Sequence, residues 1–242
     1  MKPSQVLLGG LAAAQVAYGL LRERRTEPAT RGLVGLMLGT SLVEAWEARG
    51  AGRGAGAVVA AGGLGFAVEL YGVATGRPFG HYSYTERLGP RVGGVPLLAA
   101  AAWAMMARPA WVVAGLISPR RRLRVPLAAG ALTAWDVFLD PRMAADGYWT
   151  WPQGGAYEGI PATNFLGWWV TGLGVFAVWS QMDPADDPAG DGDGALALYA
   201  WTWIGETFAN AVLWRRPAVA AAGGAAMGAF AVPALRARLS SP

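Results

Sequence analysis

The segment Trp135-Asp136-Val137-Phe138-Leu139-Asp140-Pro141 places two carboxyl groups at the end of an apolar run. Residues four apart lie on one face of a helix, so Asp136 and Asp140 are expected to point into the same space. An ionisable residue at membrane depth is expensive to bury and is therefore a functional-site hypothesis by default. The alternative is that Asp140-Pro141 ends the helix and leaves Asp140 at the aqueous interface.

The spacing of the two carboxyl groups suggests a particular chemistry. Their Cα atoms are expected ~6 Å apart, where two like charges repel by roughly 3 kcal/mol at an effective dielectric constant of ~20. We therefore expect one of the two groups to be protonated near neutral pH. A neutral acid beside a carboxylate, in an apolar and aromatic pocket, suits protonation of an alkene. The carboxylate and the aromatic faces would stabilise the cation until water captures it.

The composition indicates an integral membrane protein. The chain has 242 residues, of which 54% are hydrophobic and 15% charged, and soluble domains carry ~25% charged residues. We predict an all-α, polytopic membrane helical bundle with seven or eight transmembrane helices in a single domain, residues 1–242, of the inner plasma membrane. Residues 183–194 are rich in Asp, Gly and Pro and predict a flexible acidic linker between spans. The apolar stretches are residues 5–21, 32–47, 56–75, 94–117, 125–139, 164–181, 195–213 and 217–235, most of them long enough to cross a bilayer.

The charged and metal-binding residues exclude several classes of function. The net charge is +4, and the arginines between the spans are explained by topology and anionic lipid rather than by nucleic acid. They divide almost evenly between the two sides, so the positive-inside rule assigns no orientation. The first span is followed by Arg22-Glu23-Arg24-Arg25 and is interpreted as an anchor rather than a cleaved signal. Because the chain has no cysteine and one histidine, His81, disulfides, thiol nucleophiles and His-based metal clusters are excluded within one chain.

The loops that join consecutive spans lie alternately on the two sides of the membrane, so counting these breaks predicts which polar residues meet. The loop around residues 77–85 is the third break and the loop over 140–164 is the fifth, so both lie on the same side of the membrane. Glu69 ends the third span at that side, Asp136 and Asp140 end the fifth, and Glu206 and Asn210 lie in the half of the seventh that approaches it. We therefore expect four carboxyl groups and an amide to converge beneath two aromatic loops. Glu44 lies near the opposite face and is interpreted as a helix-packing residue.

Several short motifs, taken together in their order and spacing, resemble the CruF-type carotenoid hydratases over residues 35–215. They are Pro78-Phe79-Gly80-x-Tyr82-x-Tyr84-Thr85, Leu88-Gly89-Pro90, Gly94-Val95-Pro96-Leu97, Trp135-Asp136-x-x-x-Asp140-Pro141, Gly155-x-Tyr157-x-Gly159-x-Pro161 and Asn164-Phe165-Leu166-Gly167-Trp168. The resemblance implies hydration, without a cofactor or metal, of the terminal 1,2 double bond of an acyclic carotenoid end group to a tertiary alcohol. The implied partners are lycopene, gamma-carotene or a longer analogue in the lipid bilayer, with other carotenoid-pathway membrane enzymes as further candidates.

We assign roles from the chemistry of each side chain. Asp136 or Asp140 is the candidate proton donor, and Glu69 the candidate that orients water or accepts its proton. Asn164 is a candidate for holding that water, while His81 is expected at a solvated loop position and Arg108 has no assigned role. The remaining candidates for substrate binding are Phe79, Tyr82, Tyr84, Trp149, Tyr157, Glu206 and Asn210.

Two other functions fit part of the pattern. A Mg²⁺-dependent membrane prenyltransferase uses acidic pairs of the same spacing to hold a diphosphate, but its second pair would have to be Asp183 and Asp187 in the linker. A non-catalytic transporter or assembly subunit could use buried acids as a proton relay. It predicts no turnover of a carotenoid, whereas a hydratase adds one water to it.

Overall fold

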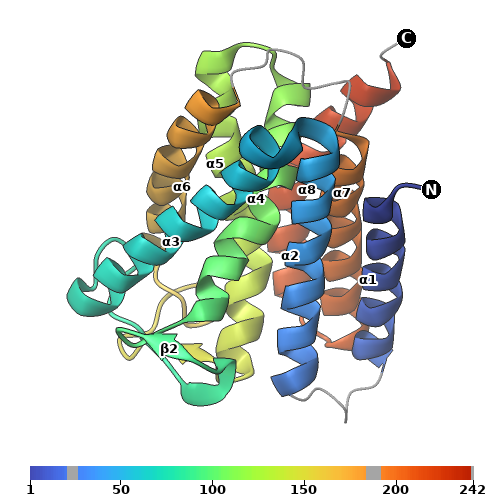
Figure 1. The fold of residues 1–242 in the computed structure, drawn as a ribbon. Helices are drawn as coiled ribbons and strands as arrows, with labels where there is room; N and C mark the ends of the chain where they lie inside the picture. The colour runs from blue at the N-terminus through green and yellow to red at the C-terminus, as the bar shows by residue number, and fades with distance from the viewer. Residues whose placement is uncertain (21–26, 184–191, 241–242) are drawn as a thin grey trace.

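The computed structural model describes residues 1–20, 27–183 and 192–240, which form an all-α bundle as expected (Figure 1). The α-helices are α1 (Pro3–Leu20), α2 (Glu27–Gly50), α3 (Gly56–Thr75), α4 (Leu97–Ile117), α5 (Arg121–Ala145), α6 (Ala162–Met182), α7 (Asp193–Phe208) and α8 (Pro217–Leu239). Shorter helical turns are η2 (Ala51–Ala55), η3 (Glu86–Leu88) and η4 (Ala209–Leu213), and the strands are β1 (Ser83–Tyr84), β2 (Arg91–Val92), β3 (Val95–Pro96) and β4 (Trp149–Thr150).

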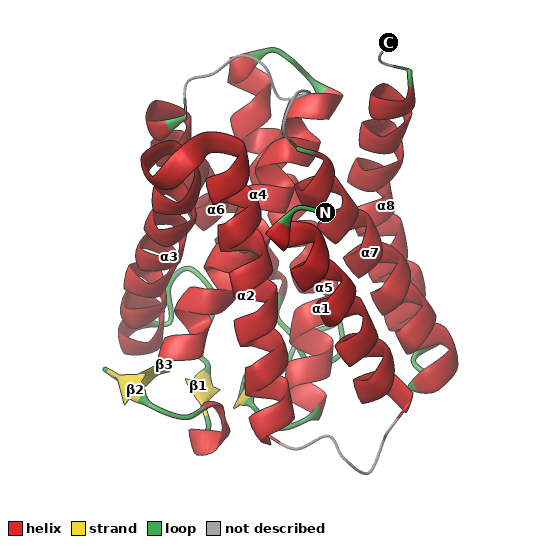
Figure 2. Ribbon diagram, turned by 45° about the vertical axis from the view of Figure 1, so that its right-hand side comes forward, coloured by secondary structure: helices red, strands yellow, loops and turns green. Residues whose placement is uncertain are grey.

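Helix α4 lies at the centre of the bundle. Every residue from 103 to 115 is buried, and α4 contacts α2, α3, α5, α7 and α8. A helix that is apolar on all sides must be surrounded on all sides, which explains this position. Both termini lie at one end of the bundle, and the short strands lie at the other (Figures 1 and 2).

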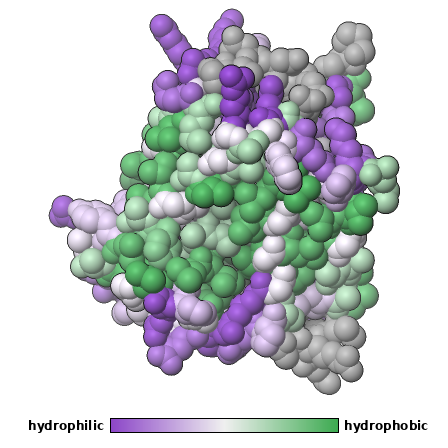
Figure 3. Space-filling view, in the orientation of Figure 1, coloured by the Kyte–Doolittle hydropathy of each residue, from purple (hydrophilic) through white to green (hydrophobic). Residues whose placement is uncertain are grey.

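Three helical segments of the described chain are long and apolar enough to cross a membrane. They are Glu27–Thr75, Leu97–Ile117 and Pro217–Leu239, and they indicate a membrane protein. The first joins α2, η2 and α3, but Gly50 has a φ of 76° and α3 runs back along the bundle in a new direction (Figure 1). Hydrophobic residues form a band across the middle of the visible face, with hydrophilic residues above and below it (Figure 3).

A buried ion pair gives Arg108 the partner that the sequence did not reveal. Its Nε lies 2.9 Å from Oε2 of Glu44, and both side chains are buried between α4 and α2. The packing role expected for Glu44 is therefore confirmed. Removing one member of such a pair leaves an uncompensated buried charge, which makes the pair a fixed link between the two helices.

Helix α5 does not end at Asp140-Pro141, so the alternative interpretation, in which Asp140 lies at the aqueous interface, is wrong. The helix continues to Ala145, and Asp140 is only 3% exposed. Pro141 lacks the N–H that would bond to the carbonyl of Val137 one turn earlier. The hydroxyl of Tyr157 donates to that carbonyl at 3.0 Å instead, which satisfies the helix beside the two aspartates.

The two aromatic loops meet, as the counting of breaks predicts. Strands β1 and β4 pair antiparallel, with Ser83 opposite Thr150 and Tyr84 opposite Trp149, and the N–H of Thr85 donates to the carbonyl of Tyr148 at 2.9 Å. His81 is exposed in the first loop, as expected.

The expected linker at 183–194 falls mostly outside the described residues, which omit 184–191. Of its ends, Asp183 is buried with its Oδ2 3.9 Å from Nε of Arg49. Asp193 and Gly194 already belong to α7.

The pairing of the loops predicts a specific cross-link. Directly opposed residues of an antiparallel pair have Cα atoms ~4.5–5.5 Å apart, which a disulfide can bridge. Because the natural chain has no cysteine, Ser83→Cys/Thr150→Cys should form one intramolecular disulfide on mild oxidation. A mobility shift on non-reducing gels and intact-mass analysis would detect it. Ser83→Cys with Gln153→Cys is the control, and equal cross-linking of both pairs would contradict the register.

Candidate active site

The candidate site is a cavity of about 70 Å³ beneath the paired loops, which we call the acid cavity. Glu69, Asp140 and Asn164 contribute its strongly polar groups, from α3, α5 and α6. The two loops, α4 and α6 supply an aromatic lining that consists of Phe79, Tyr82, Tyr84, Trp103, Trp149, Trp151 and Trp168. Polar groups that converge in an apolar concave space are the usual composition of a small-molecule site.

Asp136 and Asp140 meet at one amide. Nδ2 of Asn164, in the first turn of α6, donates to Oδ2 of Asp136 at 3.0 Å and also to Oδ2 of Asp140. Oδ1 of Asp140 accepts from the indole N–H of Trp149 at 3.1 Å. These donors are neutral, so they orient the two carboxyl groups without balancing two negative charges.

The two aspartates occupy different positions relative to the cavity. Asp140 lines it, whereas Asp136 lies one turn earlier on α5 and is completely buried. Oδ1 of Asp136 has no hydrogen-bond partner among the described residues. An ionised carboxylate only accepts hydrogen bonds, and a buried unpaired acceptor is costly, so this position favours a carboxyl pair that holds a proton.

Glu69 is held by three donors. The hydroxyl of Tyr84 donates to Oε2 at 2.9 Å, the hydroxyl of Tyr82 donates to the same oxygen, and the indole of Trp103 donates to Oε1 at 3.1 Å. Hydrogen bonds to a charged acceptor are stronger than neutral ones. The arrangement therefore fixes the Glu69 carboxyl group at the edge of the cavity, on α3 and apart from the α5 pair.

The two loop tyrosines remain donors at physiological pH. Burial, and next the charge on Glu69, raise the pKa of the Tyr84 hydroxyl well above its ordinary value, and the same causes raise the pKa of Tyr82. Both hydroxyl groups therefore keep the protons that they donate to Glu69.

Two glycines of α3 let the aromatic residues approach Glu69. A Cβ at Gly65 would lie 2.1 Å from Cγ of Trp103, and a Cβ at Gly72 would lie 2.8 Å from the hydroxyl of Tyr82. Only a residue without a side chain fits at either position. The sequence thus fixes Trp103 and the first aromatic loop directly against the helix that carries Glu69.

The structure divides the expected site into two parts. Phe79, Tyr82, Tyr84 and Trp149 line the acid cavity with Glu69, Asp140 and Asn164. Tyr157 does not line it and instead bonds to the backbone of α5 while packing on Phe165.

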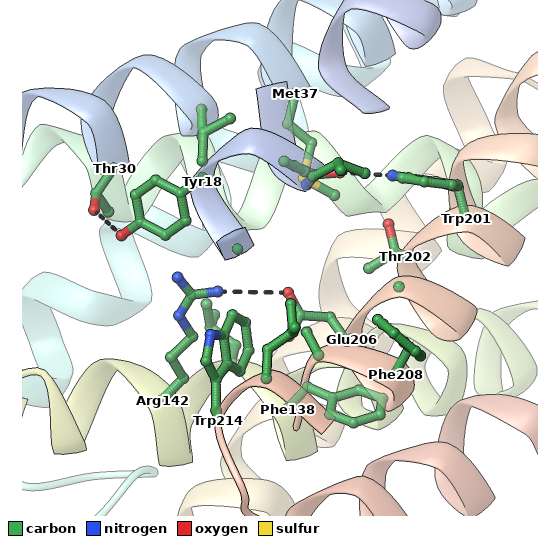
Figure 4. Close-up of a pocket in the computed structure, with 18 of the residues that line it drawn as sticks. Tyr18, Thr30, Met37, Phe138, Arg142, Trp201, Thr202, Glu206, Phe208 and Trp214 are labelled. Atoms are coloured by element: carbon green, nitrogen blue, oxygen red, sulfur yellow. Dashed lines mark hydrogen bonds and ion pairs between the residues drawn. The ribbon is translucent and has the colours of Figure 1, made fainter. Parts of the chain in front are cut away.

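Glu206 and Asn210 lie elsewhere, by a second cavity of about 240 Å³ that we call the Arg142 cavity (Figure 4). Nη1 of Arg142 lies 3.8 Å from Oε1 of Glu206, and Nδ2 of Asn210 donates to the backbone carbonyl of Glu206 at 2.9 Å. The Arg142 guanidinium also lies over the ring of Trp214, 4.1 Å from its centroid. The expectation that four carboxyl groups and an amide converge in one space is therefore wrong for Glu206 and Asn210, which lie apart from Glu69 and Asp140.

Three tryptophans that line the acid cavity, Trp103, Trp151 and Trp168, were not among the residues expected in the site. Trp103 bonds to Glu69 and stacks on Trp168 with ring centroids 4.0 Å apart, and the indole of Trp151 donates to the carbonyl of Phe79 at 3.3 Å. A buried indole N–H normally needs an acceptor, so Trp103 within an apolar span was the one available signal. Because all faces of α4 are buried, its periodicity could not show which residue faces the cavity.

The arrangement can perform acid chemistry on an apolar group. The carboxyl group of Asp140 faces an aromatic space with Glu69 at its edge. If Asp140 carries a proton, a cation formed beside it would be stabilised by ring faces and by an ionised Glu69. Within residues 1–20, 27–183 and 192–240, no group of three or more acidic or histidine side chains could hold a metal ion.

The Asn164 bridge predicts coupled stabilities. Asn164→Leu should lower the free energy of unfolding by roughly 1–3 kcal/mol, because it removes the shared donor of two buried carboxyl groups. In Asn164→Leu/Asp136→Leu the loss should be smaller than the sum of the single losses by more than ~0.5 kcal/mol. Tryptophan-detected unfolding of detergent-purified protein measures both. Additive losses would show that the amide and Asp136 do not interact.

Comparison with known proteins points to one pathway. Over 116 residues the chain is 34% identical to a bisanhydrobacterioruberin hydratase of Haloarcula japonica. The aligned region covers 44% of this chain and 38% of that protein. The chain thus matches well under half of the relative's length. No solved structure matches. The model of the family described as "Carotenoid biosynthesis protein" matches residues 31–230, which is most of the chain, and the protein therefore belongs to the carotenoid biosynthesis protein family.

Proposed function

We propose that this protein is a carotenoid hydratase that adds water across the terminal 1,2 double bond of an acyclic carotenoid end group. The observation that carries the proposal is the acid cavity, where Asp140 and Glu69 face one aromatic-lined space from different helices. Family membership supplies the substrate class, and the hydratase named among the relatives supports the reaction type.

The first step is protonation of the double bond by Asp140, the aspartate that lines the cavity. Its carboxyl proton adds to C2 of the trisubstituted alkene, the π bond breaks, and C1 becomes a tertiary cation. Asp136 acts as a positioning residue, because it lies behind Asp140 and shares the amide of Asn164. Because the two carboxyl groups lie close together, they do not both ionise readily, and this favours retention of the proton of Asp140 until an alkene arrives.

The second step is capture of the cation by water. The faces of Trp103, Trp149 and the loop tyrosines surround the space where C1 would lie, and cations bind well to such faces. Water attacks C1 and passes a proton to Glu69, from which it returns to Asp140 through the water of the next turnover. The net change is the addition of one water, with no electron transfer.

The substrate is membrane-embedded, and the protein that meets it spans the membrane. We propose that the eight helices cross the inner plasma membrane, with the aromatic loops and the acid cavity near one surface, where water is within reach. Lycopene, gamma-carotene and longer acyclic analogues carry the required end group.

The alternative of a prenyltransferase gains no support. Of its second acidic pair, Asp183 is buried beside Arg49, and Asp187 lies outside the described residues. The Oδ2 atoms of Asp136 and Asp140 point at the Asn164 amide rather than at an open space.

Substitution of the acids in lycopene-accumulating cells tests the proposal. The wild-type chain should yield a pigment heavier by one water. Asp140→Asn should lower its yield by about 100-fold or more, the range of a general acid. Asp136→Asn and Glu69→Gln should cause smaller losses that remain measurable. Mass spectrometry of extracted pigments, normalised to membrane protein level, gives the ratios.

Matched controls have exposed side chains that line neither cavity. Asp193→Asn, at the exposed start of α7, and Glu86→Gln, in the exposed turn of the first loop, make the same chemical changes and should leave the yield unaltered. Full product from Asp140→Asn would remove Asp140 from the mechanism. No new pigment from the wild-type chain with lycopene, gamma-carotene or a longer acyclic carotenoid would contradict the function itself.

A further inference from the structure

Four apolar residues line both cavities at once. Val34, Met105, Leu139 and Met143 face the acid cavity on one side and the Arg142 cavity on the other. They come from α2, α4 and α5, and we call them the partition. Methionine is unbranched and changes conformation readily, so a wall that is half methionine can open without movement of the helices.

The acid cavity is too small for a long substrate. By the same measure of volume, one water needs roughly 10–15 Å³, so about 70 Å³ has room for about five to seven waters. That space suits a short branched end group and the attacking water. The conjugated chain that continues from the end group must leave through a wall of the cavity.

The Arg142 cavity is larger than the acid cavity and mostly apolar, as binding of a polyene requires. It is about 240 Å³ in volume and runs between α1, α2, α5, α7 and η4, lined mostly by apolar and aromatic side chains. Val16 of α1 and Phe208 of α7 line it and are 49% and 55% exposed. The cavity therefore reaches the hydrophobic exterior of the bundle, where a lipid-dissolved molecule would arrive.

Several polar groups of this cavity are already engaged with one another. Arg142 and Glu206 approach each other across it (Figure 4), and the hydroxyl groups of Tyr18 and Thr30 lie 2.7 Å apart. The indole of Trp201 donates to Oε1 of Gln15 at 2.7 Å. An occupant without hydrogen-bonding groups would thus leave these polar atoms satisfied.

We infer that the two cavities are one substrate path. The polyene lies in the Arg142 cavity, the partition opens, and the end group enters the acid cavity beside Asp140. This inference rests on the proposed function for its substrate, but it makes a separate claim about where the conjugated chain binds.

Gly205 offers a way to block the path without touching the acid cavity. It lines the Arg142 cavity from α7, and a Cβ built on it would meet nothing within 4 Å. Gly205→Phe therefore places a ring in the cavity without a clash at its first atom, and Gly205→Leu fills less of it. Gly174→Phe, on the exposed side of α6, is the matched control because a Cβ there also meets nothing within 4 Å.

The experiment measures pigment retention and turnover separately. The full chain and each variant are purified in detergent from lycopene-accumulating cells, and lycopene plus any hydrated product is counted per mole of folded protein. Gly205→Phe should retain at least about tenfold less pigment than Gly174→Phe, which corresponds to ~1.4 kcal/mol, with Gly205→Leu between them. Thermal unfolding of each variant confirms that it is folded.

The outcomes distinguish the path from the function. Equal retention by folded Gly205→Phe and Gly174→Phe, or no retention even by the natural chain, would overturn the path. If retention falls as expected but the natural chain forms no hydrated product, the path stands and the hydratase proposal fails. If hydrated product forms at the natural rate in Gly205→Phe, the hydratase stands and the path fails.

Discussion

Burial of carboxyl groups among apolar helices is the constraint on which the rest of the structure depends. A buried carboxyl oxygen without a donor is expensive, and the chain supplies donors from four other places. Asn164 reaches Asp136 and Asp140 from α6, and Trp149 reaches Asp140 from the second loop. The tyrosines of the first loop and Trp103 of α4 reach Glu69. The loops therefore fold back over the bundle because the acids beneath them need partners.

The same need explains how a proline is tolerated beside the site. Pro141 frees the carbonyl of Val137, and Tyr157 from the second loop supplies the missing hydrogen bond. A carbonyl freed inside the bundle needs such a partner. The bond ties the second loop to α5 next to Asp140. The same loop therefore supplies both the hydrogen bond to the freed carbonyl and, through Trp149, a hydrogen bond to Asp140. Tyr157 thus bonds to the backbone of α5 and is not part of the cavity wall.

Much of the site followed from simple rules, and the failures have physical reasons. Helical spacing paired Asp136 with Asp140, and the parity of the breaks brought the two loops together, as the pairing of Tyr84 with Trp149 confirms. Counting the loops shows at which end of the bundle a residue lies, but not where it lies around the bundle axis. It therefore could not show that Glu206 and Glu69 line different cavities. The partner of Arg108 and the inward face of Trp103 depend on how α4 packs, and a helix buried on all faces has no periodicity that reveals this.

In the proposed reaction a carboxylic acid of this protein protonates the alkene, and water then supplies the hydroxyl group. Purified protein acting on lycopene in heavy-oxygen water, and separately in deuterium oxide, tests it directly by mass spectrometry and NMR of the product. We expect one heavy oxygen in the new hydroxyl group at C1 and one deuterium on the adjacent C2. A hydroxyl oxygen that does not come from water, or a C2 without deuterium, would contradict it.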